Sequence, residues 1–385
     1  MPPLEIQAQT LEELRTHRSE KWRQFPEDVL PLPVAEMDFP IAAPIRDLLL
    51  EMVSSSDLGY LGPIPELPIA FAQFAKKRWN WKLDPMQIHL ATDVGVGVVE
   101  VLRLLTSPGD RIVINSPVYH NFYTWINETH LEKVDVPFVE SENGWFFDFD
   151  DLEASYKAGA KVHLLCNPQN PLGRVFSKAE LLRIAHLAKE YSVVVISDEI
   201  HAPLTYADAE FVPFLSLGTE AEEVGIVITA ASKAWNIAGL KCAIVISQGE
   251  AMDALLKNLP QATHYRASLL GGFAMAIAFE QGEEWLDGVI TTLDSNRAYL
   301  AELLTKKIPE VRYRIPQNSY LAWLDMSALD LGINPSSVLL ERGRVALNSG
   351  GSFAPQTLQF VRLNFATSHL VLEEAVNRMV VAINE

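Results

Sequence analysis

Short apolar runs alternate with amphipathic stretches through the middle of the chain. Five such runs, rich in valine and isoleucine or leucine, occur at residues 111–115, 161–166, 193–197, 225–230 and 243–247. Runs this short and this continuously apolar are typical of strands that are buried on both faces of a mainly parallel sheet. Between two of them, leucines and alanines recur at helical spacing, and Ser177 with Glu180 forms the capping-box pattern of a helix start. The pattern predicts a layered α/β domain in the centre of the chain.

The two ends of the chain have different patterns. Near the N-terminus a helix-like stretch of acidic and basic residues is followed by a proline-rich run, which predicts an extended arm. Near the C-terminus helix patterns at 294–304 and 370–383 combine with strand patterns at 320–326 and 360–365, which predicts a smaller α+β domain. We therefore expect three parts: an N-terminal arm that belongs to the small domain (1–54), a large domain (55–284) and a small C-terminal domain (285–385).

Composition narrows the class of protein and of partner. With 385 residues, 49% of them hydrophobic and 21% charged, the chain has an ordinary globular composition. A formal net charge of −18 argues against a nucleic-acid or anionic-membrane partner. Two cysteines, Cys166 and Cys242, are too few for a disulfide scaffold and fit a reducing compartment. No signal-peptide core and no apolar run of about 18 residues occurs, so we expect a cytoplasmic protein.

Polar groups follow three of the predicted strands. Asn167 and Asn170 follow the run at 161–166, Asp198 follows 193–197, and Lys233 follows 225–230. Because ligands of open α/β sheets bind beyond the carboxyl ends of the strands, an amide, a carboxylate and an amine are expected at one ligand site. Pyridoxal phosphate needs such a set, because it requires a lysine for its aldehyde and an acid partner for its ring nitrogen.

These residues lie in motifs that resemble the fold-type I pyridoxal-phosphate enzymes, the aminotransferase class I/II superfamily. The motifs are Asn-Pro-x-Asn-Pro-x-Gly at 167–173, Asp-Glu at 198–199, Ser-Lys-Ala-Trp-Asn-Ile-Ala-Gly-Leu-Lys at 232–241, and Arg362 in a predicted strand. The resemblance spans essentially the whole chain. It implies pyridoxal 5′-phosphate as cofactor and an α/β fold with a mainly parallel sheet in a large domain and a smaller α+β domain.

Five segments resemble a narrower group, the MalY/PatB cystathionine β-lyases. They are 34–40 (VAEMDFP), 115–122 (NSPVYHNF), 198–201 (DEIH), 319–325 (SYLAWLD) and 345–350 (VALNSG). The resemblance implies a carbon–sulfur lyase that acts on cystathionine or related cysteine thioethers.

The resemblance also implies a role for individual residues. Lys233 would form the Schiff base and transfer protons, Asp198 would pair with the ring nitrogen, and Tyr119 would stack on the ring. Asn170 and His201 would donate to the ring oxygen. The phosphate would be held by Val94, Gly95, Ser232, Lys241 and, from a neighbouring subunit, Tyr60, which implies a homodimer with a shared active site. The amino-acid substrate would contact Arg362, Ala35 and Asn170.

Structural interpretations stand beside these roles. Asp198 could cap a helix, His201 could be a buried structural histidine, and Tyr119 could be a core tyrosine. Residues 93–100 superficially suggest a dinucleotide motif, but Glu100 replaces its third glycine and no run of β-branched residues precedes it. The histidines show no zinc-ligand spacing. The functions left open are a lyase, an aminotransferase with the same cofactor, and a regulatory protein without turnover.

Overall fold

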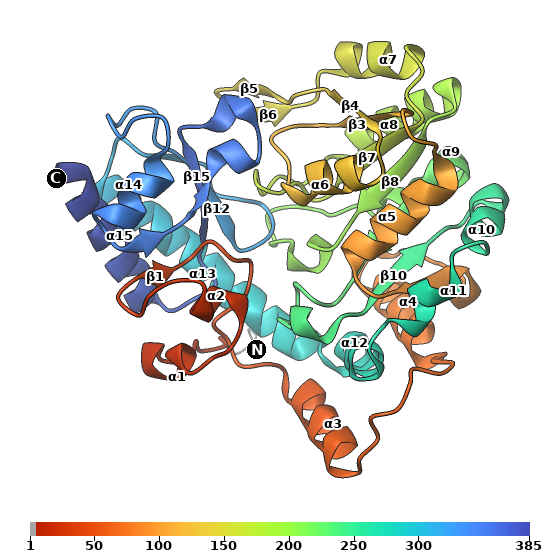
Figure 1. Cartoon of the computed structure of the whole chain (residues 1–385), viewed down its shortest axis with the longest axis horizontal. Coiled ribbons are helices and arrows are strands. Elements are labelled where there is room, and N and C mark those ends of the chain that lie inside the picture. The colour runs from red at the N-terminus through yellow and green to blue at the C-terminus, as the bar shows by residue number, and fades with distance from the viewer. Residues whose placement is uncertain (1–4) are drawn as a thin grey trace.

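The larger of the two main β-sheets forms the centre of the computed structural model, which describes residues 5–385 (Figure 1). It has seven strands in the order β2-β10-β9-β8-β7-β3-β4. Their bounds are β2 Ile88–Ala91, β3 Arg111–Ile114, β4 Glu132–Asp135, β7 Val162–Cys166, β8 Val194–Asp198, β9 Gly225–Thr229 and β10 Ala243–Ile246. Only β10 runs antiparallel to its neighbours, and β7, β9 and β10 are buried along their whole length. The predicted mainly parallel sheet is therefore confirmed.

Helices surround this sheet. They are α4 Glu66–Trp79, α5 Val94–Leu105, α6 Asn121–Glu128, α7 Phe149–Lys157, α8 Lys178–Tyr191, α9 Thr219–Val224, α10 Glu250–Leu256, α11 Gln261–Tyr265 and α12 Leu269–Gln281. Helix α8 begins with the predicted capping box, in which Ser177 Oγ accepts from the Glu180 N–H and the Glu180 carboxylate accepts from the Ser177 N–H. Strands β5 (Val139–Ser141) and β6 (Gly144–Phe146) pair with each other in an antiparallel hairpin.

The second sheet is antiparallel and lies in the C-terminal part of the chain, in the order β11-β12-β15-β14. Its strands are β11 Arg312–Tyr313, β12 Leu321–Asp325, β15 Phe360–Asn364 and β14 Asn348–Ser349, and the helices beside it are α13 Glu283–Lys307, α14 Pro335–Glu341 and α15 His369–Asn384. Helix α13 is longer than the predicted helix and runs across residue 285, so the domain boundary there stays a prediction.

The N-terminal arm connects the two parts. It contains α1 (Leu11–Arg15), α2 (Glu20–Arg23) and β1 (Leu30–Pro31), which pairs in parallel with β13 (Val345–Ala346). The arm then continues along the second sheet, because the Asn364 N–H donates to Leu32 O at 2.9 Å and the Asp38 N–H donates to Ala366 O at 2.8 Å. Beyond it, helix α3 (Ala43–Ser54) packs against α12, has Ile45 and Met52 buried, and lies at the lower edge of the molecule in Figure 1.

The structure adds one element before residues 93–100 that the sequence pattern did not indicate. Strand β2 ends two residues before the N-cap of α5, although no run of β-branched residues is present there. Its sequence, Ile-His-Leu-Ala, contains a single β-branched residue, so its strand signal is weak, and it is the pairing with β10 that forms the strand. The dinucleotide motif is still incomplete, because Glu100 stands in place of its third glycine. Among residues 5–385 there is no helix with the length and apolar character needed to span a membrane.

Candidate active site

A cavity of about 990 Å³ opens where the carboxyl ends of β7 and β8 meet the N-terminus of α5. It is lined by nearly all of the predicted site residues: Ala35, Val94, Gly95, Tyr119, Asn170, Asp198, His201, Ser232, Lys233, Lys241 and Arg362. Tyr60 is the exception. It lies on the segment after α3, 97% exposed, and does not line the cavity of its own chain.

Asp198 is a buried carboxylate with very few partners. It ends β8, is 4% exposed, and accepts one hydrogen bond, from the Ile200 N–H at 3.1 Å, within the part of the chain that the structure describes. Burial raises the pKa of Asp198 to about 7, against the opposing effects of the Ile200 N–H and the Lys233 charge. An isolated buried carboxylate is costly unless it is paired, so this site fits a cationic N–H partner such as a protonated ring nitrogen.

Lys233 follows β9 and points into the same cavity. Burial, and then the Arg362 guanidinium, lower the pKa of Lys233 to about 8, while Glu36 and Asp198 oppose this shift. Its Nζ donates a hydrogen bond to Ala35 O at 3.2 Å. An amine with this pKa is partly neutral near neutral pH, and the neutral form is the one that can react with an aldehyde.

Arg362 lies on β15, lines the cavity and is 3% exposed. It donates from Nη1 to Asn170 Oδ1 and from Nη2 to Pro33 O, both at 3.0 Å, and its buried Nε has no partner among residues 5–385. Burial lowers the pKa of Arg362 to about 10, so the guanidinium stays charged at neutral pH. An unpaired donor on a buried cation fits a carboxylate ligand. The Asn170 amide nitrogen also has no acceptor among the described residues, so it is free to donate into the cavity.

The N-terminus of α5 fits a phosphate. Asp93 Oδ1 accepts the Val96 N–H at 2.8 Å, whereas the N–H groups of Val94 and Gly95 have no acceptor among residues 5–385. A Cβ on Gly95 would lie 2.9 Å from Trp125 Nε1, so only glycine allows this close packing. Lys241 adds a positive charge, held by Asp93 Oδ2 at 3.0 Å. Free N–H groups, a helix dipole and a cation together favour an anion here.

Two predicted ring contacts lie in the cavity wall. The Tyr119 hydroxyl accepts from Asn121 Nδ2 at 2.8 Å. His201 Nδ1 lies 3.3 Å from Ser319 Oγ, and burial lowers the pKa of His201 to about 3, so its ring is neutral. Both side chains line the cavity, and stacking by Tyr119 and donation by His201 stay predictions.

Several residues at the site carried no predicted role. Tyr320 donates from its hydroxyl to Ala35 O at 2.9 Å, and Asn236 and Asn364 bind the backbone of the same segment. One signal could have identified Asn364: it lies two residues after Arg362 on a strand, so the two side chains share a face of the sheet. Asn236 follows Lys233 by three residues in an irregular segment, where periodicity gives no signal.

The raised pKa of Asp198 predicts an effect of pH on stability. Between about pH 4 and pH 7 the folded protein holds a proton on Asp198 that the unfolded chain has lost, so stability falls as pH rises through this window. We compare the free energy of unfolding of cofactor-free Asp198→Asn with that of the unsubstituted protein. We expect the difference in favour of the variant to be about 2 kcal/mol larger at pH 8 than at pH 5. Urea unfolding at both pH values measures this gain. Asp150→Asn, at a fully exposed side chain, is the control, and an equal difference at both pH values for Asp198→Asn would contradict the assignment.

Comparison with known proteins identifies the family of the chain. The family model described as aminotransferase class I and II matches residues 29–379. A cystathionine beta-lyase of Corynebacterium glutamicum is 36% identical, covering 96% of this chain and 98% of that protein, and the cystathionine beta-lyase PatB of Bacillus subtilis is 31% identical, covering 93% of both. The crystal structure of cystalysin from Treponema denticola, which contains a pyridoxal 5′-phosphate cofactor, superposes with a TM-score of 0.91 at 27% identity, over 96% of this chain and 97% of that one. The chain belongs to the aminotransferase class I and II family.

Proposed function

We propose that the protein is a pyridoxal-phosphate-dependent carbon–sulfur lyase. Its substrate would be L-cystathionine or a related cysteine thioether, cleaved by β-elimination to a thiol, pyruvate and ammonia. The observation that carries the proposal is the single cavity that contains an underpaired buried carboxylate, Asp198, a lysine of lowered pKa, Lys233, and a buried arginine with a free donor, Arg362. The relatives named cystathionine beta-lyase support the choice of reaction.

The residues of the cavity fit the cofactor at three points. Val94, Gly95, Ser232 and Lys241 would hold its phosphate, Asn170 and His201 its ring oxygen, and Asp198 its ring nitrogen. When bound, pyridoxal phosphate supplies an aldehyde that condenses with amines and a ring that accepts the electron pair left when the substrate Cα loses its proton.

Arg362 and Lys233 would act on the substrate itself. Arg362 binds the α-carboxylate through its guanidinium, which fixes the orientation of Cα in the cavity. Lys233 Nζ, partly neutral at pH 7, takes the Cα proton. Asp198 keeps the ring nitrogen protonated throughout. With cystathionine and one water consumed, the balanced products are homocysteine, pyruvate and ammonia.

The same residues also serve transamination of an L-amino acid with a 2-oxo acid. We therefore expect a direct assay to separate the alternatives. With L-cystathionine and no 2-oxo acid, the holoenzyme should release pyruvate, and Lys233→Ala should lower kcat by at least about 1,000-fold because it loses the proton-transfer group. Lys257→Ala, at a side chain that is 67% exposed, is the matched control. Product formation only after addition of a 2-oxo acid would identify an aminotransferase, and no turnover under either condition would favour a regulatory protein.

We further propose that two copies form a homodimer with shared active sites. Helix α3 and the segment after it expose four large apolar side chains: Leu50 (59%), Val53 (53%), Leu58 (56%) and Tyr60 (97%). Exposed apolar side chains gathered on one segment are typical of a protein interface. Because Tyr60 does not line its own cavity, the proposal places it at the phosphate end of the neighbouring subunit's cavity. We also propose a cytoplasmic location, which is supported by the two free, buried thiols.

A shared site predicts complementation between two inactive variants. Tyr60→Ala and Lys233→Ala homodimers should both be impaired. A hybrid dimer, however, contains one site with both native residues. After an equal mixture is unfolded and refolded, statistical pairing should restore lyase activity to about one quarter of the unsubstituted level. Activity no greater than the sum of the two separate variants would show that Tyr60 does not act across an interface.

A further inference from the structure

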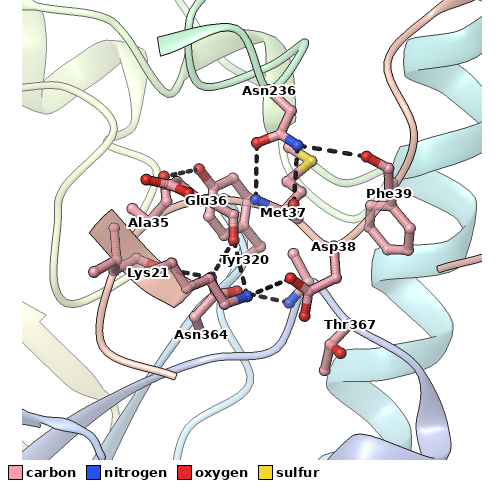
Figure 2. A network of polar contacts seen from close by, with 12 residues as sticks. Lys21, Ala35, Glu36, Met37, Asp38, Phe39, Asn236, Tyr320, Asn364 and Thr367 are labelled. Atoms are coloured by element: carbon pink, nitrogen blue, oxygen red, sulfur yellow. Dashed lines mark hydrogen bonds and ion pairs between the residues drawn. The ribbon is translucent and has the colours of Figure 1, made fainter. Parts of the chain in front are cut away.

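A backbone segment of the N-terminal arm lies against Lys233. We call residues 33–39 the strap, and Figure 2 shows most of its polar contacts. The Ala35 carbonyl in the strap accepts two hydrogen bonds, one from Lys233 Nζ at 3.2 Å and one from the Tyr320 hydroxyl at 2.9 Å. The lysine expected to transfer protons is therefore held by a main-chain oxygen of a segment distant from it in sequence.

Asn364 holds the strap from the second sheet. Its Nδ2 donates to Val34 O at 2.7 Å and to Glu36 O at 2.6 Å, on either side of Ala35, while its Oδ1 accepts the Ala366 N–H at 2.8 Å (Figure 2 labels Asn364). The Glu36 N–H also donates to Val34 O at 2.9 Å, which makes Ala35 the centre of a three-residue turn. The Asn364 amide therefore joins the two ends of the turn that presents the Ala35 carbonyl.

Asn236 holds the strap from the other side. Its Oδ1 accepts the Met37 N–H and its Nδ2 donates to Met37 O, both at 2.9 Å. Asn236 lies three residues after Lys233, so the segment that carries the lysine also forms hydrogen bonds with the strap. Lys21 adds a third attachment, with Nζ donating to Asp38 Oδ1 at 2.7 Å and to Glu36 O at 3.3 Å.

We propose that Asn364 and Asn236 are positioning residues for Lys233: by fixing the strap they hold the Ala35 carbonyl at the lysine amine, which keeps that amine in place for proton transfer. The role of Lys233 in this statement rests on the proposed function, whereas the contacts among Asn364, Asn236 and Ala35 do not. Asparagine amides suit this task, because one side chain can satisfy a donor and an acceptor of the backbone together.

We expect the hydrogen bond to Ala35 O to favour the charged form of Lys233. Four charged groups act on the amine: Arg362 and Lys241 disfavour the ammonium form, and Glu36 and Asp198 favour it. A carbonyl that accepts from an ammonium group stabilises the charged form. Displacing the Ala35 carbonyl should therefore lower the pKa of Lys233 further, a change that a general loss of stability would not cause.

Asn296 provides a matched control. It is 1% exposed, and its Nδ2 donates to two carbonyls, Phe365 O at 2.8 Å and Thr367 O at 2.7 Å, without contacting the strap. Asn296→Ala thus removes the same kind of double hydrogen bond as Asn364→Ala and should cost similar stability. An effect seen in Asn364→Ala and Asn236→Ala but not in Asn296→Ala therefore results from the loss of contacts with the strap.

The test is the pH dependence of acetic-anhydride labelling of Lys233 in the cofactor-free, full-length protein, quantified by mass spectrometry. We expect Asn364→Ala and Asn236→Ala to increase labelling at pH 7 by about three- to tenfold, because more of the amine is neutral. In the holoenzyme, kcat for cystathionine should fall about tenfold or more, and KM should change less, since Arg362 still binds the carboxylate. Asn296→Ala should change neither quantity.

The proposal is overturned if Asn364→Ala and Asn236→Ala both match Asn296→Ala in the labelling of Lys233 and in kcat for cystathionine. If Asn364→Ala does not fold, Asn236→Ala, at a side chain that is only partly buried, still decides the question. Failure of the proposed function would give a different result. The unsubstituted protein would then lack lyase activity, but the strap variants would still differ from Asn296→Ala in the labelling of Lys233.

Discussion

The constraint on which the site depends is the isolation of Asp198. Its neighbour Glu199 is equally buried, but Glu199 Oε1 accepts from the Phe214 N–H at 2.9 Å, from Ser197 Oγ at 3.0 Å and from Asn167 Nδ2 at 3.4 Å. The Asp198 carboxylate accepts one such bond from the described part of the chain. Of two adjacent buried acids, one is satisfied within the fold and the other faces a cavity. An underpaired buried carboxylate is costly in its charged form, so it either takes up a proton or needs a ligand that supplies the missing partner.

Other groups of the cavity also lack partners or have a shifted pKa. Among residues 5–385, Arg362 has a donor without an acceptor and the first turn of α5 has N–H groups without acceptors. Burial, and then the Arg362 guanidinium, lower the pKa of Lys233 to about 8 against the opposing effects of Glu36 and Asp198. Each is costly for folding alone, and each matches a different part of one ligand. Perturbed groups of this kind cluster at functional sites because catalysis requires them.

Much of the fold and site could be predicted from sequence because the relevant signals are local. The apolar runs that became β7, β8 and β9 are buried throughout or nearly so, and the polar residues after them lie together because parallel strands end at one edge. Strand β2 was missed because its pairing with β10, not its composition, forms it. The roles of Asn364 and Asn236 were also missed. Their partners are main-chain atoms far along the chain, and no periodicity encodes a contact between a side chain and a distant backbone.

The central claim is that Lys233 and Asp198 face the two ends of one cofactor ring. It is tested most directly by adding pyridoxal phosphate to the cofactor-free protein, reducing the bond between aldehyde and amine with borohydride, and locating the adduct by mass spectrometry. The account predicts a single modified residue, Lys233, with weaker cofactor retention before reduction in Asp198→Asn. An adduct on Lys241 or on a surface lysine, or retention unchanged by Asp198→Asn, would contradict it.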